Sequence, residues 1–257
     1  MMKSWIEIIL LTAGGLYLLV LAYLYFFQRT LLFHPTHESR ALEGFYLETP
    51  VGRIRIEIRN PGREKALIYF PGNSEHWWED PDDLAKLLPE HTIYFPHYPG
   101  YGASDGKPSQ KAFYTMAAAL YNRIAPRHGA IDLIGRSLGT GVALYLASLR
   151  PVRRLVLITP YDSIASLGAE RYRIFPVRAF IKDPFESLPY APKITVPVLV
   201  LLAEHDRVIP HGHSRRLLNA MSRTRSEVHT LPGTRHGDII ESPLYPKLLR
   251  RFLEEDN

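Results

Sequence analysis

The sequence predicts an α/β protein with a mostly parallel sheet, helices on both sheet faces, and one N-terminal helix long enough to span a membrane. Three observations lead to this prediction. They are a long apolar run at the N-terminus, a regular alternation of strand-like and helix-like segments, and a glycine–serine–glycine turn between two such segments. With 257 residues, the chain can form one domain with a full core behind the N-terminal segment.

The N-terminal run is apolar almost without interruption over residues 8–27. About 20 residues, each rising about 1.5 Å, cover the roughly 30 Å of a hydrocarbon core. A cleaved secretory signal is the alternative, but large aromatics occupy the place where a small-residue cleavage site would stand. We therefore predict a retained single-pass membrane anchor over residues 1–29. Basic residues are nearly balanced on its two sides, so the side of the membrane on which the domain lies stays open.

The remaining residues, 30–257, are predicted to form the globular domain. Residues 45–47 and 53–58 alternate in polarity, which is typical of an antiparallel hairpin with one face in water. Strand-like and helix-like segments then alternate, which favours a parallel sheet buried on both faces. The strands are expected near residues 65–70, 92–96, 130–134, 154–159, 197–203 and 226–231, and the helices near residues 79–88, 109–125, 138–149, 212–222 and 243–254.

A sharp turn with a serine at its apex joins the strand at residues 130–134 to the next helix. Its sequence is Gly135-Arg136-Ser137-Leu138-Gly139. Glycines at both ends lack a Cβ, so the strand and the helix can close around a strained turn that exposes the serine hydroxyl. A helix-capping serine is the simpler reading of this pattern alone. We predict that Ser137 is a nucleophile, which then requires a base and an acid that orients the base.

Both partners stand in suitable places later in the chain. Asp206 follows the buried strand 197–203, and His236 lies in the loop after the last strand. An ordinary turn aspartate and a solvated loop histidine are the alternatives for each residue alone. Their order, serine then acid then histidine, and their places at strand ends predict a Ser137–His236–Asp206 triad.

The oxyanion of an acyl-transfer reaction needs two backbone N–H donors. Leu138, directly after the nucleophile, is predicted to supply one of them. The other is expected after the strand 65–70, where Gly72 lets the backbone approach the serine. We assign this donor to the N–H of Asn73, with Ser74 as the alternative.

The segment 163–193 interrupts the alternation of strands and helices and is predicted to be a short cap insertion. About thirty residues with several prolines allow one or two short helices and no full lid. A cap this small predicts an open, shallow site that suits a bulky acyl substrate.

As a set, these motifs resemble the α/β-hydrolase superfamily of serine hydrolases. The similarity is greatest to the membrane-anchored abhydrolase-domain group, which includes protein depalmitoylases and their bacterial relatives. The resemblance implies the α/β-hydrolase fold and the same roles for Ser137, Asp206 and His236. The matching segments, which extend over nearly the whole chain after residue 30, are 30–35, 69–74, 98–104, 135–141, 159–164, 203–210 and 233–236.

The sequence therefore predicts a membrane-bound serine hydrolase that cleaves esters or thioesters of acyl or lipid-like substrates. An acylated protein is a further candidate substrate. A serine peptidase and a catalytically silent binding module on the same fold are the alternatives. No cofactor or metal is implied, and thiolate chemistry is excluded because the chain has no cysteine. The net charge of +5 comes without a nucleic-acid-binding module, so no nucleic-acid partner is expected, and the oligomeric state stays open.

Overall fold

A single sheet forms the centre of the structure, a computed structural model that describes residues 2–35, 43–74 and 81–254. Within these residues eight strands are hydrogen-bonded in the order β1-β2-β4-β3-β5-β6-β7-β8. The first two strands form the predicted antiparallel hairpin, and β2 is also antiparallel to β4. The other pairings are parallel. The strands are β1 (Gly44–Thr49), β2 (Gly52–Arg59), β3 (Lys65–Phe70), β4 (His91–Pro96), β5 (Ala130–Arg136), β6 (Leu155–Ile158), β7 (Val198–Ala203) and β8 (Ser226–Leu231).

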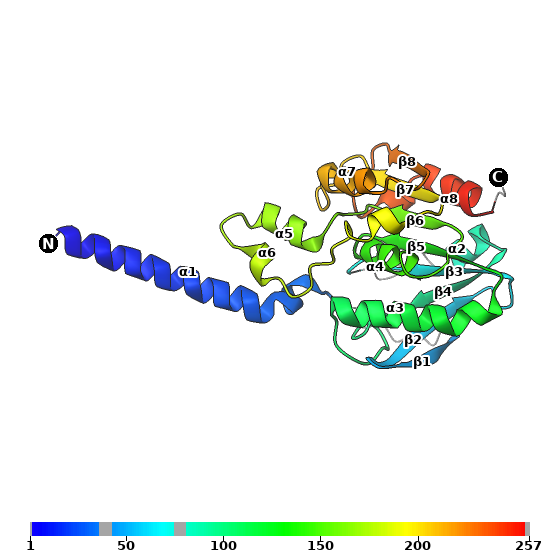
Figure 1. Ribbon diagram of the computed structural model, residues 1–257, viewed down its shortest axis with the longest axis horizontal. Coiled ribbons are helices and arrows are strands. Elements are labelled where there is room, and N and C mark those ends of the chain that lie inside the picture. Colours follow the sequence, from blue (N-terminus) through cyan, green and yellow to red (C-terminus); the bar gives the residue numbers. More distant parts are fainter. Residues whose placement is uncertain (1, 36–42, 75–80, 255–257) are drawn as a thin grey trace.

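Helices cover both faces of this sheet (Figure 1). Successive side chains of a buried strand point to opposite faces, so each strand contributes to two cores. In β3, Ile68 packs in one core and Tyr69 in the other. The first core contains α3 (Gln110–Ile124), α4 (Leu138–Ala147) and α7 (His211–Ala220), and the second contains α2 (Pro81–Leu87) and α8 (Leu244–Glu254). Short 3-10 turns lie at Ala125–Arg127 and Ile239–Glu241.

The α/β-hydrolase fold expected from the sequence is thus present. The predicted strands and helices of the sheet region agree with the structure to within two residues wherever both ends are described. The first part of the helix predicted at 79–88 lies outside the described residues. The carboxyl ends of the parallel strands meet at one edge of the sheet, where the predicted site residues follow β3, β5, β7 and β8.

Helix α1 (Met2–Leu32) extends far from the sheet at the N-terminal end of the chain (Figure 1). The part from Ser4 to Leu32 is long and apolar enough to cross a membrane, with a mean hydropathy of 2.1 in its most apolar stretch. The helix continues three residues past the predicted boundary at residue 29. Gln28 and Arg29, near this boundary, hydrogen-bond to another part of the chain.

That other part is the segment between β6 and β7. It contains α5 (Ile164–Arg171), α6 (Val177–Phe180) and a 3-10 turn at Ala191–Lys193. Figure 1 shows α5 and α6 beside the C-terminal half of α1. We refer to residues 163–193 as the cap segment.

Candidate active site

The turn between β5 and α4 holds Ser137 in a backbone conformation that non-glycine residues rarely adopt. Its φ is 48° and its ψ is −116°. Such strain persists only where the surrounding structure holds it, and it is common at functional sites. The Ser137 N–H donates to the Ile158 carbonyl at 2.9 Å, which ties the turn to β6. The turn thus directs the hydroxyl of Ser137 toward the carboxyl edge of the sheet.

Two glycines allow this turn to close. A Cβ at Gly135 would lie 2.5 Å from the Gly139 carbonyl oxygen. A Cβ at Gly139 would lie 2.1 Å from the Phe70 carbonyl oxygen. The second contact also shows that the end of β3 packs directly against the start of α4. The residues after β3 are therefore brought close to Ser137.

The structure brings together the three residues of the predicted triad. His236 Nε2 lies 2.9 Å from Ser137 Oγ, and His236 Nδ1 lies 2.8 Å from Asp206 Oδ2. Residues 99 and 30 positions apart in the sequence therefore form one continuous hydrogen-bonded chain.

Asp206 is fixed by its own neighbours. Its side chain is only 2% exposed, and its Oδ1 accepts from the backbone N–H groups of Val208 and Ile209 at 2.9 and 2.8 Å. These bonds leave Oδ2 for the imidazole. The two carboxylate oxygens thus have separate roles, which fixes the orientation of the histidine ring.

Arg136 has a role at the site that the sequence analysis did not identify. This buried side chain reaches the histidine loop, where its Nη2 donates to the Gly237 carbonyl at 2.8 Å. A residue next to Ser137 in the chain therefore holds the loop that carries His236. Only the contact across 101 positions reveals this function, and no sequence pattern marks it.

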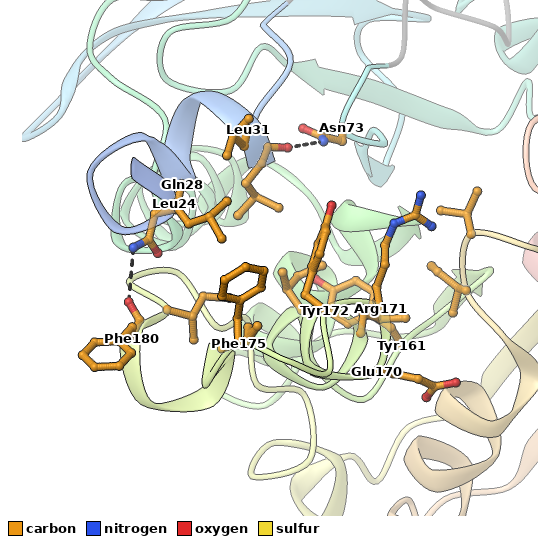
Figure 2. A pocket seen from close by; sticks show the side chains of 18 of the residues that line it. Leu24, Gln28, Leu31, Asn73, Tyr161, Glu170, Arg171, Tyr172, Phe175 and Phe180 are labelled. Atoms are coloured by element: carbon orange, nitrogen blue, oxygen red, sulfur yellow. Dashed lines mark hydrogen bonds between the residues drawn. The ribbon is translucent and has the colours of Figure 1, made fainter. Parts of the chain in front are cut away.

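Asn73 and Leu138, the two predicted oxyanion donors, both line the same cavity as Ser137. Ser74, the alternative donor, does not line it. The Asn73 side chain also has a role that the sequence did not indicate. Its Nδ2 donates to the Leu32 carbonyl at 2.5 Å (Figure 2). Its Oδ1 accepts from Tyr101 Oη at 2.8 Å. The loop after β3 is thereby attached to the end of α1.

The cavity beside Ser137 has a volume of about 950 Å³, within the range of roughly 300–1,000 Å³ for small-molecule sites. Helix α1 supplies one of its walls, which an expectation based on the cap segment alone did not include. Figure 2 shows Leu24 and Gln28 of α1 on one side, and Phe175 and Tyr172 of the cap segment on another. Most of the wall is apolar, and its charged residues include Glu170, Arg171, Arg173 and Arg207.

A buried polar cluster joins the cap segment to the sheet region behind this cavity. His213 is 1% exposed, and its two ring nitrogens lie 2.6 Å from Asp162 and 3.0 Å from Glu170. Burial alone would raise the pKa of Asp162, but hydrogen bonds from His213 and Arg216 outweigh it and lower that pKa. Asp162 is therefore charged at neutral pH and bonds to α7 through His213 and Arg216, while Glu170 of α5 contacts the same His213. Within residues 2–35, 43–74 and 81–254, no group of three or more acidic or histidine side chains could hold a metal ion.

Comparisons with known proteins agree with this geometry. Residues 70–180 match a family model for the alpha/beta hydrolase fold, and residues 186–243 match a family model described as serine aminopeptidase, S33.

Curated relatives include the lysophosphatidylserine lipase ABHD12 of Rattus norvegicus, which is 33% identical over 220 residues, covering 73% of this chain and 55% of that protein. The alpha/beta hydrolase domain-containing protein 17C of Xenopus laevis is 29% identical over 210 residues, covering 77% of this chain and 64% of that protein. An uncharacterized protein of Mycobacterium tuberculosis is 32% identical over 164 residues, covering 62% of this chain and 58% of that protein. The chain thus spans little more than half the length of the first and third of these relatives.

Solved structures show the same fold. An esterase of Pyrococcus furiosus, Pf2001, superposes with a TM-score of 0.67 at 15% identity, covering 86% of this chain and 98% of that one. Est1E of Butyrivibrio proteoclasticus superposes with a TM-score of 0.62 at 16% identity, covering 80% of this chain and 95% of that one. The sheet order, the strained serine turn, the two family models and these relatives lead to one conclusion: the chain belongs to the α/β-hydrolase superfamily.

Proposed function

We propose that this protein is a serine hydrolase that cleaves carboxylic ester or thioester bonds of acyl or lipid-like substrates. The observation that carries the proposal is the Ser137–His236–Asp206 chain of hydrogen bonds in the wall of a mostly apolar cavity. The names of the relatives, a lipase and an esterase among them, point in the same direction.

In the first half of the proposed reaction, Ser137 Oγ attacks the acyl carbon while His236 Nε2 takes the hydroxyl proton. His236 Nδ1–H donates to Asp206 throughout, which keeps Nε2 available as the proton acceptor. The backbone N–H groups of Leu138 and Asn73 stabilise the oxyanion of the tetrahedral intermediate. When this intermediate collapses, the alcohol or thiol leaves with the proton from His236, and the acyl group stays on Ser137.

In the second half, His236 removes a proton from water, and the resulting hydroxide attacks the acyl-enzyme. The acyl–Oγ bond breaks, the carboxylic acid leaves, and the proton returns to Ser137. The mostly apolar wall of the cavity supports an acyl group as the part of the substrate that binds there. An acyl chain in such a cavity stays out of water, which is favourable for apolar surface.

The proposed enzyme is anchored in a membrane by α1. The support for this is the length of the apolar span from Ser4 to Leu32, whose side chains are largely exposed outside the part that meets the cap segment. Exposed apolar surface on this scale is favourable in lipid and costly in water.

The test of the chemistry is Ser137→Ala. We expect turnover of ester substrates to fall about 10⁶-fold, as in other triads, while thermal unfolding stays close to that of the wild type. A fluorophosphonate probe should label the wild type and fail to label the variant.

The matched control is Ser222→Ala, because Ser222 is an exposed serine outside the site. It should keep wild-type activity and labelling. A wild type that is folded but neither reacts with the probe nor hydrolyses any ester would instead favour the silent binding module.

A serine peptidase is the second candidate, since residues 186–243 match a family model of that description. Esters and amides that share one acyl group distinguish the two functions. Faster hydrolysis of the amide, relative to the uncatalysed rates, would favour the peptidase over the esterase.

A further inference from the structure

Helix α1 is attached to the cap segment along one of its faces. Tyr17 Oη donates to the Ile174 carbonyl at 2.9 Å, and the rings of Tyr17 and Phe175 are stacked 5.5 Å apart. Further along the helix, Gln28 Nε2 donates to the Phe180 carbonyl at 3.2 Å (Figure 2). The two segments therefore lie side by side over about three turns of α1.

An ion pair at the end of this contact fixes the helix to the domain. Arg29 Nε lies 2.7 Å from Asp183 Oδ2, and the Asp183 side chain is only 3% exposed. Asp183 Oδ1 also accepts from the backbone N–H of Gln110 at the start of α3. One buried carboxylate thus joins α1, the cap segment and the sheet region. The anchor helix therefore has a defined position relative to the domain.

The same helix face lines the cavity of the active site. Leu21, Leu24 and Gln28 line the cavity and are half-buried, whereas Phe26 and Leu19 are exposed and do not line it. These three residues are three and four positions apart, which places them on one face of the helix, and the exposed Tyr23 and Tyr25 line the cavity on either side of Leu24. The cavity therefore extends continuously from Ser137 to the surface of the anchor helix.

The length of α1 places the part of the cavity that this helix lines within the hydrocarbon core of a membrane. The apolar span from Ser4 to Leu32 has 29 residues, and a hydrocarbon core takes about 20. A window of about 20 residues within this span, wherever it begins, contains both Tyr17 and Leu21. The cap residues that contact Tyr17 must then reach the hydrocarbon region beside the helix. Their exposure agrees with this position, since Ile174 is 74% exposed and apolar.

From this geometry we propose that the tip of the cap segment, residues 172–181, inserts into the leaflet beside α1. The cavity between the two then opens sideways into that leaflet. Its occupant is the acyl chain of a membrane-resident substrate, which reaches Ser137 without passing through water. Helix α1 is thus a wall of the substrate site as well as an anchor. This inference rests on the proposed hydrolase function.

The charged residues at the tip fit a position at the boundary between lipid and water. Lys182 Nζ donates to the Tyr25 carbonyl and lies 4.2 Å from the centre of the Tyr25 ring. Arg173 and Arg178 donate to the Glu170 carbonyl and to Ser166 Oγ in α5, so their charged ends are held on the side of the tip that faces the domain. The apolar residues between them can therefore enter the leaflet while the charges stay near its surface.

Leu24→Trp tests the cavity wall in full-length protein reconstituted into phosphatidylcholine vesicles. We compare turnover of a water-soluble acetyl ester with turnover of a long-chain acyl thioester that stays in the bilayer. A larger side chain at Leu24 should obstruct the chain, so the ratio of long-chain to short-chain turnover should fall about tenfold or more. Leu19→Trp, on a face of α1 that does not line the cavity, should leave this ratio unchanged.

An unchanged ratio in Leu24→Trp, or an equal fall in both variants, would overturn the proposed entrance. Failure of the wild type to react with a fluorophosphonate or to hydrolyse either substrate would contradict the hydrolase function itself. The two failures are therefore distinguishable.

Insertion of the tip can be measured directly, because the chain has no cysteine and a single introduced one can be labelled. A fluorophore on Ile174→Cys should be quenched by lipids that carry a quencher on the acyl chain. The same fluorophore on Val228→Cys, exposed on β8, should respond only to a quencher in water. Quenching of the Ile174 site by the aqueous quencher alone would rule out insertion.

Discussion

At the scale of single residues, the two carboxylate oxygens of Asp206 have different hydrogen-bond partners, and this has a testable consequence. Oδ1 accepts two backbone N–H groups, so in the variant Asp206→Asn the amide oxygen would stay at that position and the NH₂ group would face His236. The imidazole would then accept at Nδ1 and carry its proton on Nε2. In this tautomer it cannot take the proton of Ser137.

We therefore expect Asp206→Asn to lower kcat on a soluble ester about 10⁴-fold with little loss of stability. Steady-state kinetics and thermal unfolding measure the two effects. Asp83→Asn, at an exposed position on α2, is the control and should match the wild type. Activity of Asp206→Asn within tenfold of the wild type would contradict the orienting role of this carboxylate.

Also at this scale, the sequence allowed us to predict which residues come together at the site. It did not allow us to predict every hydrogen bond that holds the site in place. Ser137, Asp206 and His236 could be predicted because each follows a strand in the expected order. The contact of Arg136 with Gly237 and the bond from the Asn73 side chain to Leu32 could not. Both depend on the packing of distant segments, and neither leaves a periodic pattern in the chain.

At the scale of the elements, the closure of β5 against α4 depends on the absence of a side chain at Gly139. A methyl group there would lie 2.1 Å from a backbone oxygen, which cannot move without displacing β3. We expect Gly139→Ala to destabilise the protein by about 1–3 kcal/mol, the usual cost of overpacking, and to reduce fluorophosphonate labelling of Ser137. Denaturant unfolding and labelling rates measure both.

Gly212→Ala is the matched control for this substitution. It adds the same methyl group to another helix, where the nearest atom is the end of the Arg216 side chain at 3.5 Å. Because alanine is the better helix former, the stability should be unchanged or rise by up to about 1 kcal/mol. Equal stability of the two variants would refute the proposed steric role of Gly139.

The elements themselves could largely be predicted. Continuous apolar runs such as β3 and β7 are buried on both faces, and turn residues mark their ends. The face of α1 that contacts the cap segment could not be predicted, for a physical reason. A helix that faces lipid on one side and protein on the other is apolar all round, so its sequence shows no stripe that distinguishes the two faces.

At the scale of the whole molecule, the cluster around Asp162 ties the cap segment to the sheet region and should make stability depend on pH. The pKa of Asp162 is lower in the folded state than in the unfolded state, where it is about 3.9. The resulting stabilisation is complete well above pH 4 and is lost as the pH falls through the folded-state pKa. Protonation at low pH therefore weakens the hydrogen bonds that Asp162 accepts from His213 and Arg216.

Asp162→Asn tests this. Arg216 is half-exposed, so part of the interaction is screened, and we expect a loss of about 1–3 kcal/mol at pH 7. The difference between variant and wild type should begin to shrink below about pH 4, where the carboxyl of the unfolded wild-type chain takes up a proton, and should be lost as the pH falls through the lower folded-state pKa. Denaturant unfolding at pH 7, 5 and 2.5 measures the difference. A gap that stays constant over this range would mean that the charge of Asp162 contributes nothing.

Purification is affected by the position of α1. A detergent that extracts the protein must coat this helix, and the coated surface borders the cavity that leads to Ser137. Alkyl tails are then concentrated at the mouth of the site and compete with whatever enters there. From the proposed lateral opening we therefore expect rates measured in micelles to vary with the tail length of the surfactant, and rates in lipid nanodiscs to vary with the acyl chains of the lipid.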